Sequence, residues 1–155
     1  MALSTVNREG TSFTLIDDSF NANPDSMKAG LNGLKAWNSN DGKEPFRVAL
    51  LGAMLELGAD ETALHTSIGT YADELGIDAI IAVGSAQDQH LDALAQALAD
   101  GARQSQSASV DCVHDIDAAE QLVIDLARNH PDAVVLLKGS HASGLSALAE
   151  RWTKN

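Results

Sequence analysis

The stretch IDDSFNANPDSM, residues 16–27, joins the end of an apolar run to the start of a helical pattern. The apolar residues Leu15 and Ile16 give way abruptly to two carboxylates, and a polar turn follows. Asn23 is a residue type preferred at a helix N-cap, and Pro24 suits the first helical turn because its φ is already fixed there. The stretch therefore predicts a strand, a polar loop and a helix start. In open α/β sheets, ligands bind at this place, beyond the carboxyl end of a strand.

The composition is that of a globular protein. The 155 residues are 45% hydrophobic and include only three prolines, so we expect residues 1–155 to form a single domain with one core. A net charge of −12 opposes binding to nucleic acid or anionic lipid and is typical of a well-solvated surface. Cys112 is the only cysteine, which fits a reducing compartment. Because no apolar run approaches the roughly 20 residues that cross a bilayer, and the first residues lack a signal-peptide pattern, we expect a cytoplasmic domain.

Strand-like and helix-like segments alternate along the chain. Five apolar segments, each followed by a helical stripe, are expected as strands at residues 11–16, 47–52, 79–84, 110–113 and 134–137. A short strand near residues 4–7 is expected to pair with the first of them, and Asp117 with Glu120 to cap the fourth helix. Continuous apolar strands are typical of a parallel sheet covered on both faces. The pattern predicts a Rossmann-like, doubly wound and mostly parallel α/β sheet with an antiparallel strand at its N-terminal edge.

Polar residues and glycines gather where the predicted strands end. In strand order these residues are Asp17, Asp18, Gly52, Gly84, Ser85, Lys138, Gly139, Ser140 and His141. An acid at one strand end and a Lys-Gly-Ser run at another could face a polar ligand such as a nucleotide or a peptide. The alternative role for Asp17 and Asp18 is turn formation, and for Lys138 a surface charge. Lys138 is notable because its strand is otherwise wholly apolar.

Several well-known site patterns are absent from the sequence. There is no G-x-G-x-x-G, so a dinucleotide cofactor is unsupported. The run 138–140 is not a phosphate-binding P-loop, because the apolar run before it contains no glycine. The histidines and the single cysteine show no metal-ligand spacing, and no G-x-S-x-G nucleophile elbow occurs. The chain by itself therefore has no complete catalytic apparatus.

Four motifs together resemble a known family. They are DDSFNANPDSM at 17–27, LGAMLELG at 51–58, HTSIG at 65–69 and LKGS at 137–140. Their order and spacing resemble the MurF-type ligases of the Mur ligase family, which join D-alanyl-D-alanine to UDP-N-acetylmuramoyl-tripeptide. The resemblance runs from about Thr11 to Trp152, and the first motif is the most specific.

The resemblance implies that the chain is the C-terminal, Rossmann-like domain of a three-domain enzyme. The domain that binds the UDP-sugar and the central P-loop domain that binds ATP are then absent from this chain, and both are its partners. The implied reaction uses ATP and Mg²⁺ in the full-length enzyme to form an acyl phosphate, which the amine of D-Ala-D-Ala attacks. The third domain closes over nucleotide and dipeptide, and on its own it is expected to bind no cofactor and to be inactive.

Site residues follow from the motif positions, and none is implied to be catalytic on this domain alone. The resemblance assigns nucleotide binding to Asp18 and Asn21, and substrate binding to Ser19, Asn23, Lys138 and Ser140. Asp18 would accept hydrogen bonds from the ribose of ATP. Lys138 and Ser140 would face the dipeptide carboxylate or the phosphates, whose charge a lysine complements.

The sequence departs from the family pattern at two positions. Phe20 stands where the family has tyrosine, and Ala53 where it commonly has aspartate, so neither supplies a polar group. Glu56 could bond backbone amides of the turn after it or touch substrate, and we favour the structural role. His65 lies beside an apolar stripe and is interpreted as a packed residue rather than a catalyst.

Two other classes of function remain as alternatives. A receiver-like signalling domain also has five βα units, an acidic pair after its first strand and a lysine after its last. That reading fails at the middle strand, which ends in Val83-Gly84-Ser85 instead of a phosphate-accepting aspartate. A stand-alone nucleotide- or dipeptide-binding module is the other alternative.

Overall fold

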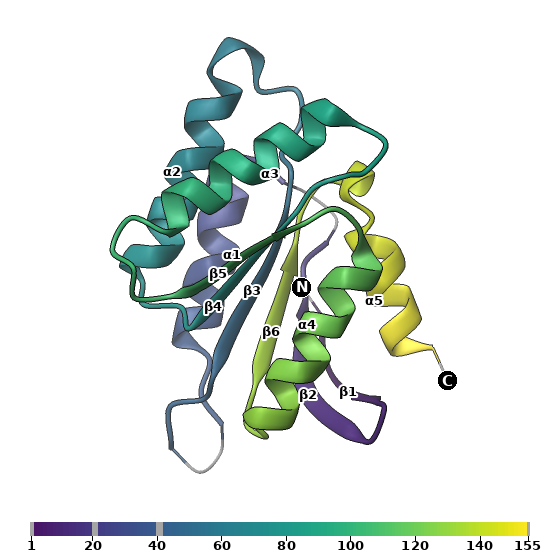
Figure 1. The fold of residues 1–155 in the computed structure, drawn as a ribbon. Coiled ribbons are helices and arrows are strands. Elements are labelled where there is room, and N and C mark those ends of the chain that lie inside the picture. Colours follow the sequence, from purple (N-terminus) through teal and green to yellow (C-terminus); the bar gives the residue numbers. More distant parts are fainter. Residues whose placement is uncertain (1, 20–21, 40–41, 155) are drawn as a thin grey trace.

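The computed structural model describes residues 2–19, 22–39 and 42–154 and contains one six-stranded sheet in the order β1-β2-β6-β3-β4-β5 (Figure 1). The strands are β1 (Ala2–Arg8), β2 (Thr11–Asp17), β3 (Arg47–Gly52), β4 (Ala79–Val83), β5 (Ser109–Val113) and β6 (Val134–Lys138). The helices are α1 (Pro24–Ala36), α2 (Glu61–Glu74), α3 (Gln89–Ala102), α4 (Ile116–Asn129) and α5 (Leu145–Thr153). Short 3-10 turns at Gly58–Asp60 and His141–Ser143 precede α2 and α5.

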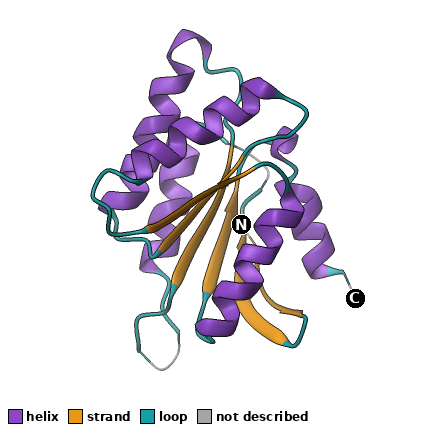
Figure 2. Cartoon of the chain, viewed as in Figure 1, coloured by secondary structure: helices purple, strands orange, loops and turns teal. Residues whose placement is uncertain are grey.

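Helices cover both faces of the sheet, as the sequence predicts (Figure 2). Met27 of α1, Ile68 of α2 and Leu98 of α3 belong to one core cluster, whereas Val123 of α4 and Leu148 of α5 belong to the other. Because helices lie on both sides, β3, β4 and β6 are buried along their whole length. This double burial is the reason for their continuous apolar sequences.

The strand pairing confirms the mostly parallel sheet and its antiparallel edge. β2, β6, β3, β4 and β5 pair in parallel, and β1 pairs antiparallel with β2. The connection between β1 and β2 is Glu9-Gly10, and both residues have positive φ, at 49° and 78°. A two-residue hairpin turn with positive φ at both central positions matches the twist of the strands, which explains the glycine.

The strand order places a topological switch point beside β6. β6 is last in the sequence but lies between β2 and β3. The chain leaves β2 for α1 on one face, and leaves β6 for α5 on the opposite face (Figure 1). Neighbouring strands that lead to opposite faces open a crevice at their carboxyl ends. The polar residues at the ends of β2 and β6 therefore lie at this switch point of the sheet.

The N-terminus of α1 is capped as the sequence predicts. The Asn23 side-chain oxygen accepts the Ser26 backbone N–H at 2.9 Å, and the Ser26 hydroxyl accepts the Asn23 backbone N–H at 3.0 Å. Pro24 occupies the first helical position. This reciprocal capping box fixes the direction in which the chain enters the helix.

The cap predicted for α4 is wrong by two residues. Asp115 is the N-cap, and its carboxylate accepts the Ala118 backbone N–H at 2.7 Å. Asp117 and Glu120 instead accept hydrogen bonds from Arg151 of α5, at 2.9 and 3.0 Å. Arg151, which is distant in sequence, thus pairs with the two carboxylates that the local sequence pattern predicted as the helix cap.

His65 fixes the loop between β3 and α2. Its ring is fully buried; Nε2 lies 2.9 Å from the Met54 backbone nitrogen, and Nδ1 lies 2.7 Å from the Glu61 carbonyl oxygen. Since the Met54 N–H donates to Nε2, the ring proton is on Nδ1 and the imidazole is neutral. Burial lowers the pKa of His65 below its usual value. The interpretation of His65 as a packed structural residue is confirmed.

Helices α2 and α3 meet through two glycines. A Cβ atom at Gly69 would collide with the Leu98 carbonyl oxygen, and one at Gly101 with the Thr66 carbonyl oxygen. Glycine therefore lets the two helix backbones touch directly.

In the part of the chain that the structure describes, no helix is both long and apolar enough to cross a membrane.

We expect Gly69→Ala to destabilise the fold by about 2 kcal/mol, because the new methyl group has no space against the α3 backbone. Urea unfolding of the 155-residue chain measures the effect. Gly30→Ala is the matched control: its Cβ would meet its nearest neighbours at an ordinary 3.4 Å. That change should be neutral or stabilising by up to about 1 kcal/mol, as expected for alanine in a helix. Equal effects of the two substitutions would contradict the proposed close contact.

We expect the free energy of unfolding to fall as the pH drops below about 6.5, because the unfolded histidine takes up a proton that the folded ring resists. The stabilising contribution of His65 is complete above about pH 6.5. Below that pH, uptake of one proton lowers the free energy of unfolding by at most about 1.4 kcal/mol per pH unit. His65→Gln should reduce this slope, since an amide can make both backbone hydrogen bonds without titrating. Urea unfolding between pH 5 and pH 8 measures it. His141→Gln, at an exposed histidine, should leave the slope unchanged.

Candidate functional site

An ion pair joins the two most informative sequence motifs. Lys138 Nζ lies 2.8 Å from Asp18 Oδ2, so the ends of β6 and β2 meet as the sequence predicts. The backbone supports the same contact, because the Asp18 N–H donates to the Leu137 carbonyl oxygen at 3.0 Å. The predicted convergence of Asp18 and Lys138 at one edge of the sheet is confirmed.

The two partners differ in their access to solvent. The Lys138 side chain is 2% exposed and the Asp18 side chain 23% exposed. Within residues 2–19, 22–39 and 42–154, the ammonium group of Lys138 has no hydrogen-bond acceptor other than Asp18. An ammonium group can donate three hydrogen bonds, so two of its donors remain unused there. Lys138 is therefore a buried cation, and not the surface charge considered as its alternative role.

Gly30 of α1 provides the space for this ion pair. A Cβ atom at Gly30 would lie 3.4 Å from both the Cδ atom of Lys138 and Oδ2 of Asp18. The helix therefore covers the lysine stem and approaches the carboxylate closely. Sequence reasoning missed Gly30, and its only signal was a glycine on the apolar face of a predicted helix.

Ser19 and Asp17 form a tight turn directly after β2. The Ser19 hydroxyl donates to Asp17 Oδ1 at 2.6 Å, and the Ser19 backbone N–H lies 3.2 Å from the same oxygen. Ser19 is buried, and its carbonyl oxygen accepts the Ser146 hydroxyl of α5 at 3.1 Å. The turn-forming role considered for Asp17 is present. Ser19 links the β2 loop to α5, and its hydroxyl points to Asp17.

The hydroxyl of Ser140, two residues after Lys138, has no hydrogen-bond partner among the described residues. Its backbone N–H donates to the Ala53 carbonyl oxygen at 2.9 Å, and its own carbonyl oxygen accepts the Ser143 hydroxyl at 2.6 Å. The Ser140 Oγ atom is buried, yet no described residue hydrogen-bonds to it. A buried hydroxyl without a partner costs free energy, so such an atom calls for an explanation.

Two glycines bring the ends of β3 and β6 together. A Cβ atom at Gly139 would come within 2.9 Å of the Gly52 backbone, and one at Gly52 would collide with the Ser143 side chain. Glycine at both positions therefore permits this close approach of the two backbones. The loop after β6 is held against the end of β3.

The remaining predicted residues are less closely tied to the ion pair. Asn23 is exposed and serves as the cap of α1, while Asn21 and Phe20 lie outside the described residues. Glu56 is exposed, has a positive φ of 61°, and makes no hydrogen bond to described residues of the turn after it. The interpretation of Glu56 as a residue that bonds those amides is wrong, because its side chain faces solvent. His141 is exposed at the start of the 3-10 turn.

The described residues contain no cluster of three His, Cys, Asp or Glu side chains that could hold a metal ion.

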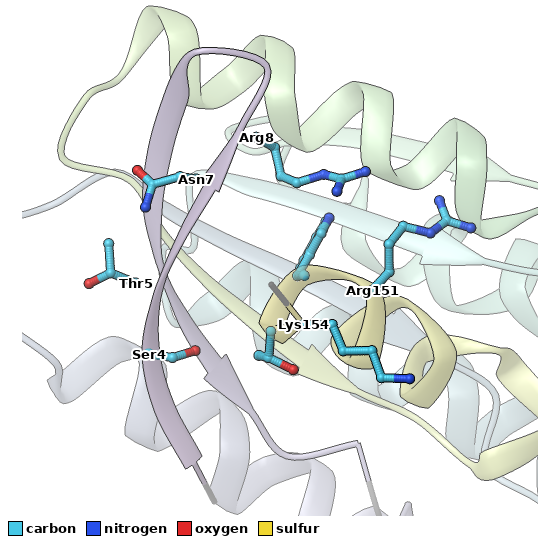
Figure 3. Close-up of a pocket in the computed structure, with 8 residues that line it drawn as sticks. Ser4, Thr5, Asn7, Arg8, Arg151 and Lys154 are labelled. Carbon is cyan, nitrogen blue, oxygen red and sulfur yellow. The ribbon is translucent and has the colours of Figure 1, made fainter.

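Two cavities lie away from the ion pair. One, of about 280 Å³, lies beside Trp37 and the β1–β2 hairpin. The other, of about 160 Å³, lies between β1 and α5 and is lined by Arg8, Arg151 and Lys154 among others (Figure 3). Each of these three cations already has a carboxylate partner among Glu120, Asp117 and Glu150.

Two mycobacterial proteins are similar to this chain over nearly its whole length. UDP-N-acetylmuramoyl-tripeptide–D-alanyl-D-alanine ligase of Mycobacterium tuberculosis (strain CDC 1551 / Oshkosh) is 38% identical over 151 residues, covering 94% of this chain and 29% of the relative. The ligase of the same name from Mycobacterium leprae is 38% identical over 146 residues, covering 88% of this chain and 27% of the relative. The chain thus spans less than a third of the length of these relatives.

Solved structures share the fold. MurF from Acinetobacter baumannii (crystal structure II) superposes with a TM-score of 0.72 at 25% identity, covering 97% of this chain and 30% of that one. MurF ligase from Thermotoga maritima, solved in complex with ADP, gives a TM-score of 0.62 over 96% of this chain and 29% of that one. At 20% identity the second comparison shows the fold alone.

The comparisons support the Mur ligase interpretation and lend nothing to the receiver alternative, whose required aspartate is missing at the end of β4. The family model described as "Mur ligase, glutamate ligase domain" matches residues 3–141. This match, over most of the chain, shows that the protein belongs to the Mur ligase, glutamate ligase domain family.

Proposed function

We propose that this chain is the C-terminal domain of an ATP-dependent ligase that adds D-Ala-D-Ala to UDP-N-acetylmuramoyl-tripeptide in peptidoglycan precursor synthesis. The observation that carries the proposal is the Asp18–Lys138 ion pair, which joins two family motifs at the switch point of the sheet. The names of the 38% identical relatives support the same reaction. The cytoplasm, where ATP is available, is the proposed location.

In the proposed reaction, ATP phosphorylates the tripeptide carboxylate, and the D-Ala-D-Ala amine attacks the acyl phosphate and releases phosphate. An acyl phosphate is readily hydrolysed, so water must be excluded while the amine is bound. The proposed task of this domain is to close over the nucleotide and dipeptide, against the UDP-sugar-binding and P-loop domains of the same protein. Domain closure also brings together binding groups that no one domain holds alone.

The proposed roles of the site residues follow their motif positions. Asp18 and Asn21 would contact the nucleotide, and Ser19, Asn23 and Ser140 would form the dipeptide side of the cleft, while Lys138 lies buried behind Asp18. Asp18 fits this role because its carboxylate is partly exposed at the carboxyl end of β2. Ser140 fits because its buried hydroxyl still lacks a partner among the described residues. Ser19 would act through the loop, since its own hydroxyl is bonded to Asp17.

ATP and Mg²⁺ fit this chain only in part. The carboxylate of Asp18 can accept hydrogen bonds from sugar hydroxyls, but the sequence has no P-loop to hold phosphates. The described residues also lack a set of metal ligands. Phosphate and Mg²⁺ binding are therefore assigned to the proposed central domain.

We expect that changing both Asp18 and Lys138 to Ala will lower the rate of phosphate release by the full-length ligase at least about tenfold, since a lost charged hydrogen bond costs about 1.5–3 kcal/mol. The assay contains ATP, Mg²⁺, UDP-N-acetylmuramoyl-tripeptide and D-Ala-D-Ala. Circular dichroism of the 155-residue variant checks that the fold is intact. Lys154→Ala, at an exposed ion pair far along α5, is the control and should retain full activity.

A full rate in the folded double variant would show that Asp18 and Lys138 are only structural, and would favour a pure binding module over the proposed role. An unmutated full-length protein that fails to release phosphate with these substrates would reject the proposed reaction itself.

We expect the isolated chain to bind ATP only weakly, because it offers a ribose-binding edge without a phosphate-binding loop. Isothermal titration calorimetry with ATP measures the affinity. A dissociation constant of about 1 μM or tighter, equivalent to about −8 kcal/mol, would contradict this expectation.

A further inference from the structure

Lys138 combines full burial with a positive charge. It ends β6, a strand with neighbours on both sides, and its side chain is 2% exposed. Among the described residues, the carboxylate of Asp18 is its sole ionic partner, at 2.8 Å. A buried ammonium group without an anion beside it is strongly unfavourable, so the two side chains are held together.

The two residues of the ion pair differ in their access to a ligand: Asp18 can be reached from solvent, whereas Lys138 lies behind it. Of the pair, Asp18 is the one with solvent access, at 23% exposure. α1 covers the lysine, since a Cβ atom at Gly30 would contact the Lys138 stem at 3.4 Å. A ligand entering at the carboxyl ends of the strands therefore meets the carboxylate first.

We propose that Lys138 is a positioning residue that acts through Asp18 and does not itself touch the dipeptide or the phosphates. Its ammonium group engages Oδ2 of Asp18, so the other carboxylate oxygen stays available to accept a hydrogen bond from a sugar hydroxyl. A carboxylate already held in one orientation loses less conformational freedom when a ligand binds. The cation also offsets the negative charge that would otherwise repel a polyphosphate nearby. This inference rests on the proposed function and names the nucleotide sugar as the part of the substrate that Lys138 serves.

A double-mutant cycle in the full-length ligase tests the proposal. The variants are Lys138→Met, which keeps the apolar stem, Asp18→Asn, and the two combined. Lys138→Met alone should raise the KM for ATP about tenfold and leave the KM for D-Ala-D-Ala within about twofold. In the Asp18→Asn background, the same lysine change should have an effect of less than about twofold, because the group it positions has already been altered.

Two further variants separate positioning from a loss of stability. Gly30→Val crowds the Lys138 stem and the Asp18 carboxylate without changing any charge, and it should also raise the KM for ATP. Gly30→Ala fits at ordinary contact distance and should not. Lys154→Met makes the same chemical change as Lys138→Met at an exposed ion pair, and both KM values should stay as they are.

Other results would overturn the proposal. If Lys138→Met raises the KM for D-Ala-D-Ala by the same factor with and without Asp18→Asn, the lysine binds the dipeptide directly. An unchanged KM for ATP would show that the ion pair is only structural. If Lys138→Met lowers the melting temperature of the chain too far for assay, Gly30→Val decides: an unchanged KM for ATP there rejects the inference. A wild-type ligase inactive with these substrates would reject the proposed function, and this inference with it.

Discussion

A buried lysine at the end of a central strand constrains how this fold can be assembled. Lys138 lies between the helices and the sheet, where an ammonium group without a counterion would be strongly destabilising. The carboxylate of Asp18 must therefore stand beside it, which requires the end of β2 to lie next to the end of β6. Position 30 can hold nothing larger than alanine, because the lysine stem and the carboxylate occupy the space under α1. One ion pair thus links two strand ends and a helix.

Buried charges hold other junctions of the molecule in a similar way. Arg47, at the start of β3, donates from Nε to the Leu34 carbonyl oxygen at 3.0 Å and from a terminal nitrogen to the Trp37 carbonyl oxygen at 2.8 Å. Both carbonyl groups lie at the C-terminal end of α1, where carbonyl groups have no partner from a following helical turn. On the opposite face, Glu120 accepts the Trp152 indole N–H at 2.6 Å and pairs with Arg8 at 3.2 Å. It therefore ties α4 to both α5 and β1.

Much of the fold and part of the site could be predicted from local sequence. The positions of the strands, the helix N-cap at Asn23 and the hairpin before β2 depend on neighbouring residues, and all three are confirmed. The convergence of Asp18 and Lys138 could be expected because parallel strands end at one edge. The cap of α4 was misplaced because Arg151, distant in sequence, engages Asp117 and Glu120. The need for a small residue at position 30 could not be predicted, since it depends on a side chain more than a hundred residues away.

The sequence by itself determined the elements, the turns and the presence of polar groups at strand ends, because periodicity, capping and turn chemistry act over a few residues. Only the tertiary structure decided that β6 inserts between β2 and β3, that Lys138 is buried against Asp18, and that the Ser140 hydroxyl lacks a partner among the described residues. The physical reason is that burial and ion pairing depend on which distant segments share a surface. A residue's own neighbours in the chain do not specify that surface.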